Sequence, residues 1–115
     1  LNIALKAAKK RARDKGVSFD DSLNSEEILS IFNNQRGCCA ISGLPMTWAH
    51  ENKHSNDGTR RGTNISIDRV DSADGYKREN VRLVCERANK IKSNMSDGDM
   101  YFWCLQIANT IRLRE

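Results

Sequence analysis

Two oxygen-bearing side chains stand where a local hairpin would bring them together. Asp68 lies in a run that alternates apolar and polar residues, 64–70, and Asn89 follows a second apolar run, 81–84. A strand, a wide turn, a second strand and a short helix would place the carboxylate of Asp68 near the amide of Asn89. Mg²⁺ favours such oxygen donors and keeps waters and substrate phosphate oxygens around itself. The pair therefore predicts a Mg²⁺ or Mn²⁺ site that polarises a phosphodiester bond.

The elements around this pair can be predicted from local signals. Turn-forming residues fill 71–76, so we expect a hairpin with a wide loop, followed by a short helix at about 85–92. The apolar stretch 39–46 is punctuated by Gly and Pro and predicts a strand or tight turn that serves as scaffold. Residues 49–64 carry almost no apolar side chains and predict a surface loop.

Helices are expected on both sides of this core. Helix formers run from 3 to 15 before Gly16, and Asn24 begins a capping signal for a second helix that ends near residue 35. A last helix starts at the Ser96 cap and carries an apolar stripe at helical spacing. The stripe consists of Met100, Trp103, Cys104, Ile107, Ala108 and Ile111. We expect this helix to pack in the core through Trp103 and Ile107.

The composition fits one α+β domain. A chain of 115 residues with 38% hydrophobic content can supply one core. The expected parts are a helical segment 1–36, a hairpin-and-helix core 37–95 and a C-terminal helix 96–115. The net charge of +4 and the pI near 9.0 permit a nucleic-acid partner.

The ends and the apolar runs bear on location. No run approaches the roughly 18 apolar residues of a membrane span, and the first residues lack the apolar segment of a signal peptide. We expect no membrane partner and an intracellular, cytoplasmic protein of a bacterial or phage-infected cell. Leu1 in place of an initiating Met predicts a longer chain, with additional domains or a homodimer as further expectations.

Several motifs together resemble the HNH (ββα-metal, His-Me finger) endonucleases. The signature is carried by SIDRVDS at 66–72, GY at 75–76, ENVRLVC at 79–85 and ANKIK at 88–92. Upstream, RARDKG at 11–16 and CAISGLP at 39–45 resemble phage and bacterial members of the family. The resemblance implies a ββα-metal core and hydrolysis of phosphodiester bonds in double-stranded DNA, in a homing, restriction, packaging or recombination role. It places Asp68 and Asn89 at the metal-ligand positions, and Asn80 at the Asn that braces loop and strand.

The chain departs from the family at Arg69. Most HNH nucleases carry there the His that activates the attacking water, whereas Arg is permanently charged and a poor base. A minority branch, which includes the restriction enzyme PacI, has Arg in this place and a catalytic Tyr nearby. By that resemblance Arg69 clamps the phosphate and Tyr76 activates the nucleophile, helped by nearby positive charge. Two alternatives stay open: Tyr76 packs on the turn, or His50 or His54 supplies the base.

Basic side chains around the expected centre are candidates for DNA backbone contacts. They are Arg60, Arg61, Lys90 and Lys92, with Lys6, Lys10 and Arg13 on one face of the first helix. An ordinary solvated surface is the alternative for each of them.

Structural zinc is not expected. Many HNH domains carry two Cys-x-x-Cys knuckles, but here Ser42 follows Cys39 and Ala88 follows Cys85 at the knuckle spacing. A four-thiolate site cannot form from these pairs, and we expect reduced thiols.

Two further function classes compete with the nuclease. The absence of His at Arg69 favours a catalytically degenerate HNH-fold module that binds DNA, whereas the presence of both Asp68 and Asn89 argues against it. A zinc-stabilised interaction domain is weakened by the incomplete knuckles.

Overall fold

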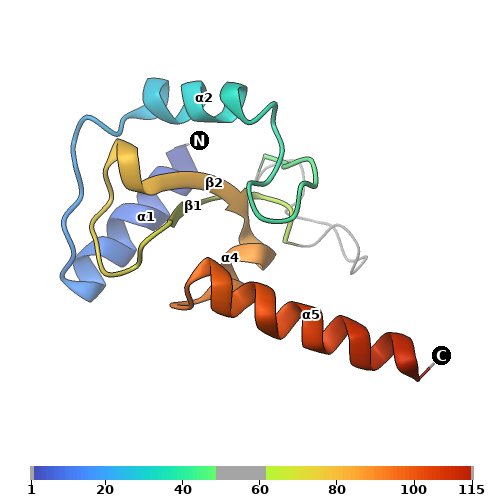
Figure 1. Cartoon of the computed structure of the whole chain (residues 1–115). Coiled ribbons are helices and arrows are strands. Elements are labelled where there is room, and N and C mark those ends of the chain that lie inside the picture. The colour runs from blue at the N-terminus through green and yellow to red at the C-terminus, as the bar shows by residue number, and fades with distance from the viewer. Residues whose placement is uncertain (1, 49–61, 115) are drawn as a thin grey trace.

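The computed structural model describes residues 2–48 and 62–114 of the chain, which form an α+β fold (Figure 1). Its centre is an antiparallel hairpin of β1 (Ile65–Arg69) and β2 (Val81–Cys85), with a 3₁₀ turn at Arg78–Asn80 before β2. The α-helices of the described residues are α1 (Asn2–Lys15), α2 (Ser25–Asn34), α4 (Glu86–Lys92) and α5 (Asp97–Leu113). None of them is both long and apolar enough to cross a membrane.

The predicted helix boundaries are confirmed because the capping side chains act as expected. Asn24 accepts a hydrogen bond from the backbone N–H of Glu27 at 3.0 Å and starts α2. Ser96 does the same for α5. Gly16 ends α1 with a φ of +68°, a conformation that costs little without a Cβ.

The two faces of the hairpin differ in chemistry. The register pairs Ile67 with Leu83 on one face and Asp68 with Arg82 on the other. The apolar face points to α1 and α2, while α4 packs on the hairpin from the polar side. All five residues of β1 are buried. Its alternation of apolar and polar residues therefore reflects two faces that are both covered, one by apolar and one by polar contacts.

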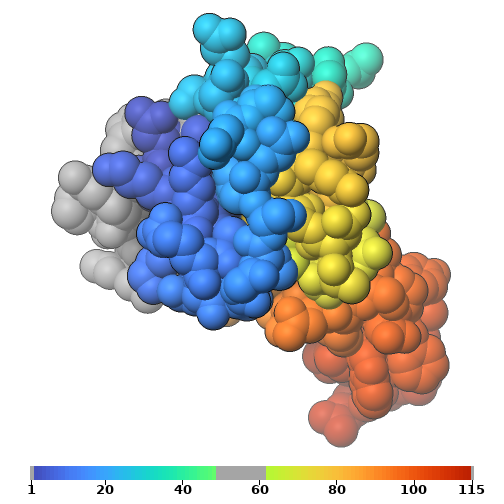
Figure 2. Space-filling model, turned by 90° about the vertical axis from the view of Figure 1, so that its left-hand side faces the viewer, coloured from blue at the N-terminus to red at the C-terminus, as the bar shows by residue number. Residues whose placement is uncertain are grey.

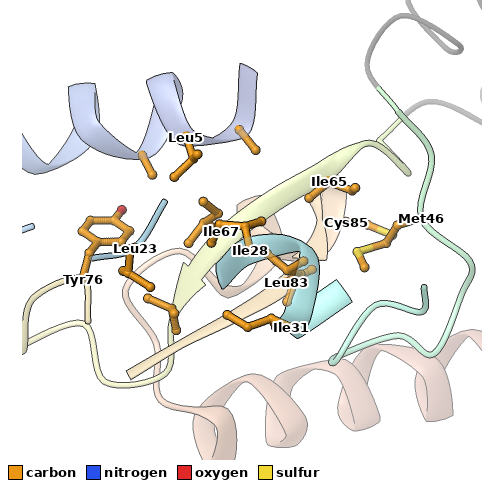
Figure 3. Close-up of a cluster of buried hydrophobic side chains, with 14 of the residues drawn as sticks. Leu5, Leu23, Ile28, Ile31, Met46, Ile65, Ile67, Tyr76, Leu83 and Cys85 are labelled. Carbon is orange, nitrogen blue, oxygen red and sulfur yellow. The ribbon is translucent and has the colours of Figure 1, made fainter. Parts of the chain in front are cut away.

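The core lies between the apolar hairpin face, α1 and α2 (Figure 3). Leu5 from α1 and Ile28 from α2 approach Ile67 and Leu83 from the two helices. Three buried alanines of α1, at positions 4, 8 and 12, allow the helix to lie close to β1 because their side chains are small.

The backbone groups on the outer edges of the two strands are satisfied in different ways. Along β2, the Gln35 amide stands in for a third strand: it donates to the carbonyl of Leu83 at 2.8 Å and accepts from its N–H at 3.0 Å. The tight turn predicted at 39–46 is confirmed and lies beside the same edge, where the Ala40 N–H also reaches the Leu83 carbonyl. Among residues 2–48 and 62–114 no second strand pairs with the outer edge of β1, although the Ile65 N–H donates to the Thr47 carbonyl at 3.1 Å.

The predicted packing of α5 is wrong. Met100 is buried, but Trp103 and Ile107 are 56% and 57% exposed. After its first turn the helix runs past the hairpin and projects from the body (Figures 1 and 2). Helical spacing of apolar residues defines a face, but it does not supply an element within the same fold to cover it.

We predict a large difference between two leucine truncations. Leu83→Ala removes a fully buried side chain at the centre of the core and should lower the free energy of unfolding by about 2–5 kcal/mol. Leu29→Ala alters a side chain that is already 43% exposed and should cost less than about 1 kcal/mol. Urea denaturation monitored by circular dichroism measures both, and equal losses would contradict this description of the core.

Candidate functional site

A cavity of about 410 Å³ lies along the open edge of β1, between α1 and α4. Four of the five predicted catalytic residues line it: Asp68, Arg69, Tyr76 and Asn89. Three basic residues, Arg11, Lys15 and Lys90, lie around the same cavity. The structure thus brings together residues from α1, β1, the turn and α4, which are spread over most of the chain.

Asp68 is buried on the polar face of the hairpin and is held by two cations. Its Oδ2 accepts from Arg82 Nε at 2.9 Å, and Lys92 Nζ lies 3.0 Å from Oδ1 and 3.1 Å from Oδ2. Register places Arg82 directly across the hairpin, while Lys92 comes from the end of α4. The carboxylate is therefore charge-compensated within the fold.

Lys92 is a correction to the predicted phosphate contacts. Its side chain is fully buried, and its ammonium donates to Asp68 and to the backbone carbonyls of Arg69 and Val70. A buried ammonium needs such partners because its desolvation is costly. Lys92 fixes α4 to β1 and cannot act as a surface contact for DNA.

Arg82 extends this network to α5. Its Nη1 and Nη2 donate to the two carboxylate oxygens of Asp97 at 2.8 and 2.7 Å. Burial acts to lower the pKa of Arg82, but the hydrogen bonds to Asp97 and Asp68 raise it above its ordinary value. The hydrogen bonds from Arg82 lower the pKa of Asp97. The first turn of α5 is thus tied to β2 and, through Arg82, to Asp68.

Arg69 and Tyr76 form one stacked unit at the cavity. The Arg69 guanidinium lies over the Tyr76 ring, 5.1 Å from its centroid, and its Nη1 donates to the carbonyls of Ser72 and Asp74 at 2.6 and 3.0 Å. The Tyr76 ring also packs on Phe19, with the ring centroids 5.3 Å apart. Tyr76 therefore packs on the turn and lines the cavity at the same time.

Arg11 completes this wall of the cavity from α1. Its Nη2 donates to the Ile67 carbonyl at 2.8 Å, which satisfies an acceptor on the open edge of β1. Its Nε approaches the Tyr76 hydroxyl at 3.3 Å. These contacts hold the phenolic oxygen and the strand edge in fixed relative positions.

Asn80 lies behind the site and holds the turn together. Its side-chain oxygen accepts from the Asp71 N–H at 2.9 Å, and its amide nitrogen donates to the carbonyls of Asp71 and Gly75 at 3.0 and 2.9 Å. Gly75 is required because a Cβ there would lie 2.0 Å from Ser18 Oγ. The turn that carries Tyr76 is therefore set by Asn80 from within and by Ser18 from outside.

Asp68 and Asn89 bring to the cavity two oxygen-bearing side chains of the type that a hard divalent cation prefers. Asn89 donates its amide N–H to Ser66 Oγ at 2.8 Å, which orients the side chain and leaves its carbonyl oxygen as an acceptor. Among the described residues, Asp68 Oδ1 accepts from Lys92 alone, so it keeps acceptor capacity. One carboxylate and one amide meet the low protein-ligand demand of Mg²⁺. The described part of the chain has no cluster of three or more His, Cys, Asp or Glu suited to a metal.

Cys39 and Cys85, the single cysteines of the two incomplete Cys-x-x-Cys knuckles, lie together in the structure. The sulfur of Cys39 accepts from the backbone N–H groups of Ser42 and Cys85 at 3.3 and 3.2 Å. Burial acts to raise the pKa of Cys39, but the hydrogen bonds from Ser42 and Cys85 bring it below its ordinary value. Burial and the neighbouring Cys39 raise the pKa of Cys85 to about 11. All four cysteines are free thiols.

The remaining predicted phosphate contacts differ in position. Lys90 is exposed and lies at the cavity. Lys6, Lys10 and Arg13 are exposed on α1, where Lys10 pairs with Asp14 at 2.8 Å. The candidates Arg60, Arg61, His50 and His54 lie outside the described residues.

Four residues of the site were missed by sequence reasoning: Arg11, Lys15, Ser66 and Arg82. A signal existed for three of them. Arg11 follows Ala8 by three positions and Lys15 follows Arg11 by four, which places both beside the buried alanine face, and Ser66 shares a strand face with Asp68. Arg82 could be found only from the pairing register of the hairpin.

Comparisons with known proteins identify no relative: no family model matches the chain, and neither curated proteins nor solved structures give a match. The function is therefore argued from the residues and their geometry.

Two neighbouring lysines of α4 provide a matched test of the buried pair. Lys92→Met leaves Asp68 and two carbonyls without the ammonium and should lower the free energy of unfolding by about 3–5 kcal/mol. Lys90→Met changes an exposed side chain and should stay within about 0.5 kcal/mol of the parent. Thermal and urea unfolding compare the two, and similar stabilities would rule out the buried pair.

The Arg82–Asp97 pair predicts a pH-dependent contribution to stability. Because the folded pKa of Asp97 is lowered, its contribution is full above the ordinary Asp pKa of about 3.9 and is lost as the pH falls through the lowered value. The Asp97 side chain is 48% exposed, so Asp97→Asn should cost no more than about 1 kcal/mol at pH 7. Unfolding curves between pH 7 and pH 3 measure the gap, which should narrow once the pH falls below the ordinary Asp pKa. A gap that stays constant, or one equally large for Asp99→Asn, would contradict the assignment.

Proposed function

We propose that the chain is a metal-dependent endonuclease domain of the HNH type, which hydrolyses phosphodiester bonds of double-stranded DNA. The observation that carries this proposal is the single cavity that gathers Asp68, Arg69, Tyr76 and Asn89. These residues come from three separate elements, and the resemblance to the HNH signature had assigned roles to all four.

The cavity has the size and charge for one backbone phosphate. Its volume of about 410 Å³ lies in the range of about 300–1,000 Å³ for small-ligand sites, so it can take a phosphodiester and adjoining sugar but not a whole duplex. Arg11, Lys15, Arg69 and Lys90 supply positive charge at its walls against one further acidic residue, Glu86, while the charge of Asp68 is already compensated by Arg82 and Lys92. The arrangement attracts an anion.

The protein groups have separable tasks in this proposal. Asp68 and Asn89 would hold Mg²⁺ or Mn²⁺, which supplies Lewis-acid polarisation of the scissile phosphate when bound. Arg69, fixed by the turn carbonyls and by stacking on Tyr76, presents its guanidinium to the phosphate. Tyr76 is the candidate base within the described residues, with His50 and His54 as the alternatives.

One observation favours the second candidate, a DNA-binding module without catalysis. Both oxygens of Asp68 are within 3.1 Å of an ammonium or guanidinium nitrogen, and this positive charge opposes a further cation. If no metal displaces or shares these contacts, the cavity would still bind a phosphate through its basic residues. Cleavage, and not DNA binding, separates the two functions.

The test is cleavage of supercoiled plasmid with Mg²⁺, Mn²⁺ or EDTA, with DNA affinity measured in parallel in EDTA. Asp68→Asn, chosen because it keeps the side-chain shape, and Asn89→Ala should each lower the rate at least about a hundredfold. The matched controls Asp21→Asn and Asn109→Ala change exposed residues outside the cavity and should cut like the parent. Circular dichroism verifies that each variant is folded.

Tyr76→Phe distinguishes the candidate bases, with Tyr101→Phe on exposed α5 as its control. Loss of the hydroxyl should lower the rate by about 10²–10⁴-fold if Tyr76 is the base. Full activity of Tyr76→Phe would instead place the base at His50 or His54. A parent chain that binds DNA but cuts none with either metal would overturn the nuclease proposal in favour of the binding module.

A further inference from the structure

The apolar residues of α5 recur at helical spacing, but only the first turn of the helix packs against the rest of the fold. The stripe comprises Met100, Trp103, Cys104, Ile107, Ala108 and Ile111. Met100 is buried against the body, whereas Trp103, Ile107 and Ile111 are each more than half exposed. The remaining turns of the helix project from the fold (Figure 2). A partner is therefore missing along a defined face of α5.

The exposed surface is large for a monomer of this size. On the stripe, Trp103, Ile107 and Ile111 are 56%, 57% and 54% exposed, which leaves on the order of 300 Å² of surface open to solvent. Tyr101, Phe102, Leu105 and Leu113 are also exposed, but they lie off the stripe on other sides of the helix. Patches of about 300–600 Å² are the largest found on typical monomers and commonly mark interaction sites.

The charges of α5 favour a second copy of the same helix in the antiparallel orientation. The first turn carries Asp97 and Asp99, and the last residues include Arg112 and Arg114. In an antiparallel pair each acidic end lies beside the basic end of the other helix. The two helix dipoles also run in opposite directions, which is favourable. A parallel pair would place like charges together at both ends.

The spacing of the stripe is self-complementary about a two-fold axis between Leu105 and Gln106. In the register that brings Asp99 to the level of Arg112, Cys104 and Ile107 of the two helices meet at the centre of the contact, while Trp103 and Ala108 lie at one level on its two opposite sides. Ile111 of each helix then lies at the level of the other helix's Met100, which is already buried against its own body, so the exposed part of the contact is formed by Trp103, Cys104, Ile107, Ala108 and Ile111. Isologous interfaces of two-fold dimers require a self-complementary surface.

We infer that two copies of this chain form a homodimer by antiparallel pairing of their α5 helices through the apolar stripe. Beyond the first turn, which packs on the body, α5 continues from Tyr101 to Leu113 over about 20 Å, long enough for three to four turns of contact. The Arg82–Asp97 hydrogen bonds anchor the base of α5, so the helix presents the stripe at a fixed position beside the hairpin. This inference does not depend on the proposed nuclease activity.

The first experiment measures mass in solution. Sedimentation equilibrium over a wide concentration range should show the 13.0 kDa chain converting to a species of twice that mass. Ile107→Asp places a charge in the stripe and should leave only monomer. Its matched control Gln106→Asp adds the same charge at the neighbouring position outside the stripe and should dimerise like the parent. A monomeric parent, or equal dimerisation of both variants, would overturn the inference.

A charge exchange tests the orientation. Arg112→Asp should weaken dimerisation at least about threefold by placing acidic groups at both ends of each antiparallel contact. Adding Asp99→Arg restores the opposite charges and should recover most of the lost affinity. Failure of the double variant to recover, with helix content unchanged by circular dichroism, would overturn the antiparallel pairing. Plasmid cleavage is not used as a readout, so failure of the nuclease proposal would leave this result unaffected.

Discussion

The buried carboxylate of Asp68 is the constraint on which the arrangement of elements depends. A charge on a covered face of a hairpin needs compensation, and Arg82 and Lys92 supply it from β2 and from the end of α4. Arg82 continues to Asp97, so the same network fixes the base of α5. Hairpin register, the position of α4 against β1 and the direction in which α5 leaves the body are therefore linked through one group of four charges. Apolar residues could fill this volume at a lower desolvation cost, but they would not specify how the helices pack against the hairpin.

The two edges of the hairpin explain why the cavity lies where it does. The Gln35 amide satisfies both the N–H and the carbonyl of Leu83 on the outer edge of β2, as a further strand would. On β1, the Ile65 N–H donates to the Thr47 carbonyl and Arg11 donates to the Ile67 carbonyl, and the strand lines the cavity between α1 and α4. A short hairpin with one satisfied and one open edge leaves room for a cavity at the open one, where α1 and α4 keep other strands from pairing.

The helices and strands could be predicted from local signals. The burial of side chains and the packing of α5 depend on contacts that local signals do not define. The caps at Asn24 and Ser96, the turn at 71–76 and the two strands could be predicted because each depends on neighbours in the sequence. The proximity of Asp68 and Asn89 followed from the same local connections. Lys92 was misplaced because its burial depends on how the end of α4 packs against β1, and no spacing rule distinguishes a buried lysine from a solvated one. The packing of α5 was wrong for a related reason, since a helical stripe is equally consistent with an internal partner and with a second molecule.

The charge balance at Asp68 also sets a requirement for the proposed nuclease. Two cations already share this one carboxylate, so a divalent ion beside it meets repulsion from Lys92 and Arg82 as well as attraction from Asp68. The neutral oxygen of Asn89 adds a ligand but no charge. The missing negative charge is available from the substrate, because a phosphodiester in the cavity would contribute its own oxygens to the ion. Metal and DNA binding would then strengthen each other by the same factor, as linkage demands of two ligands that share one site.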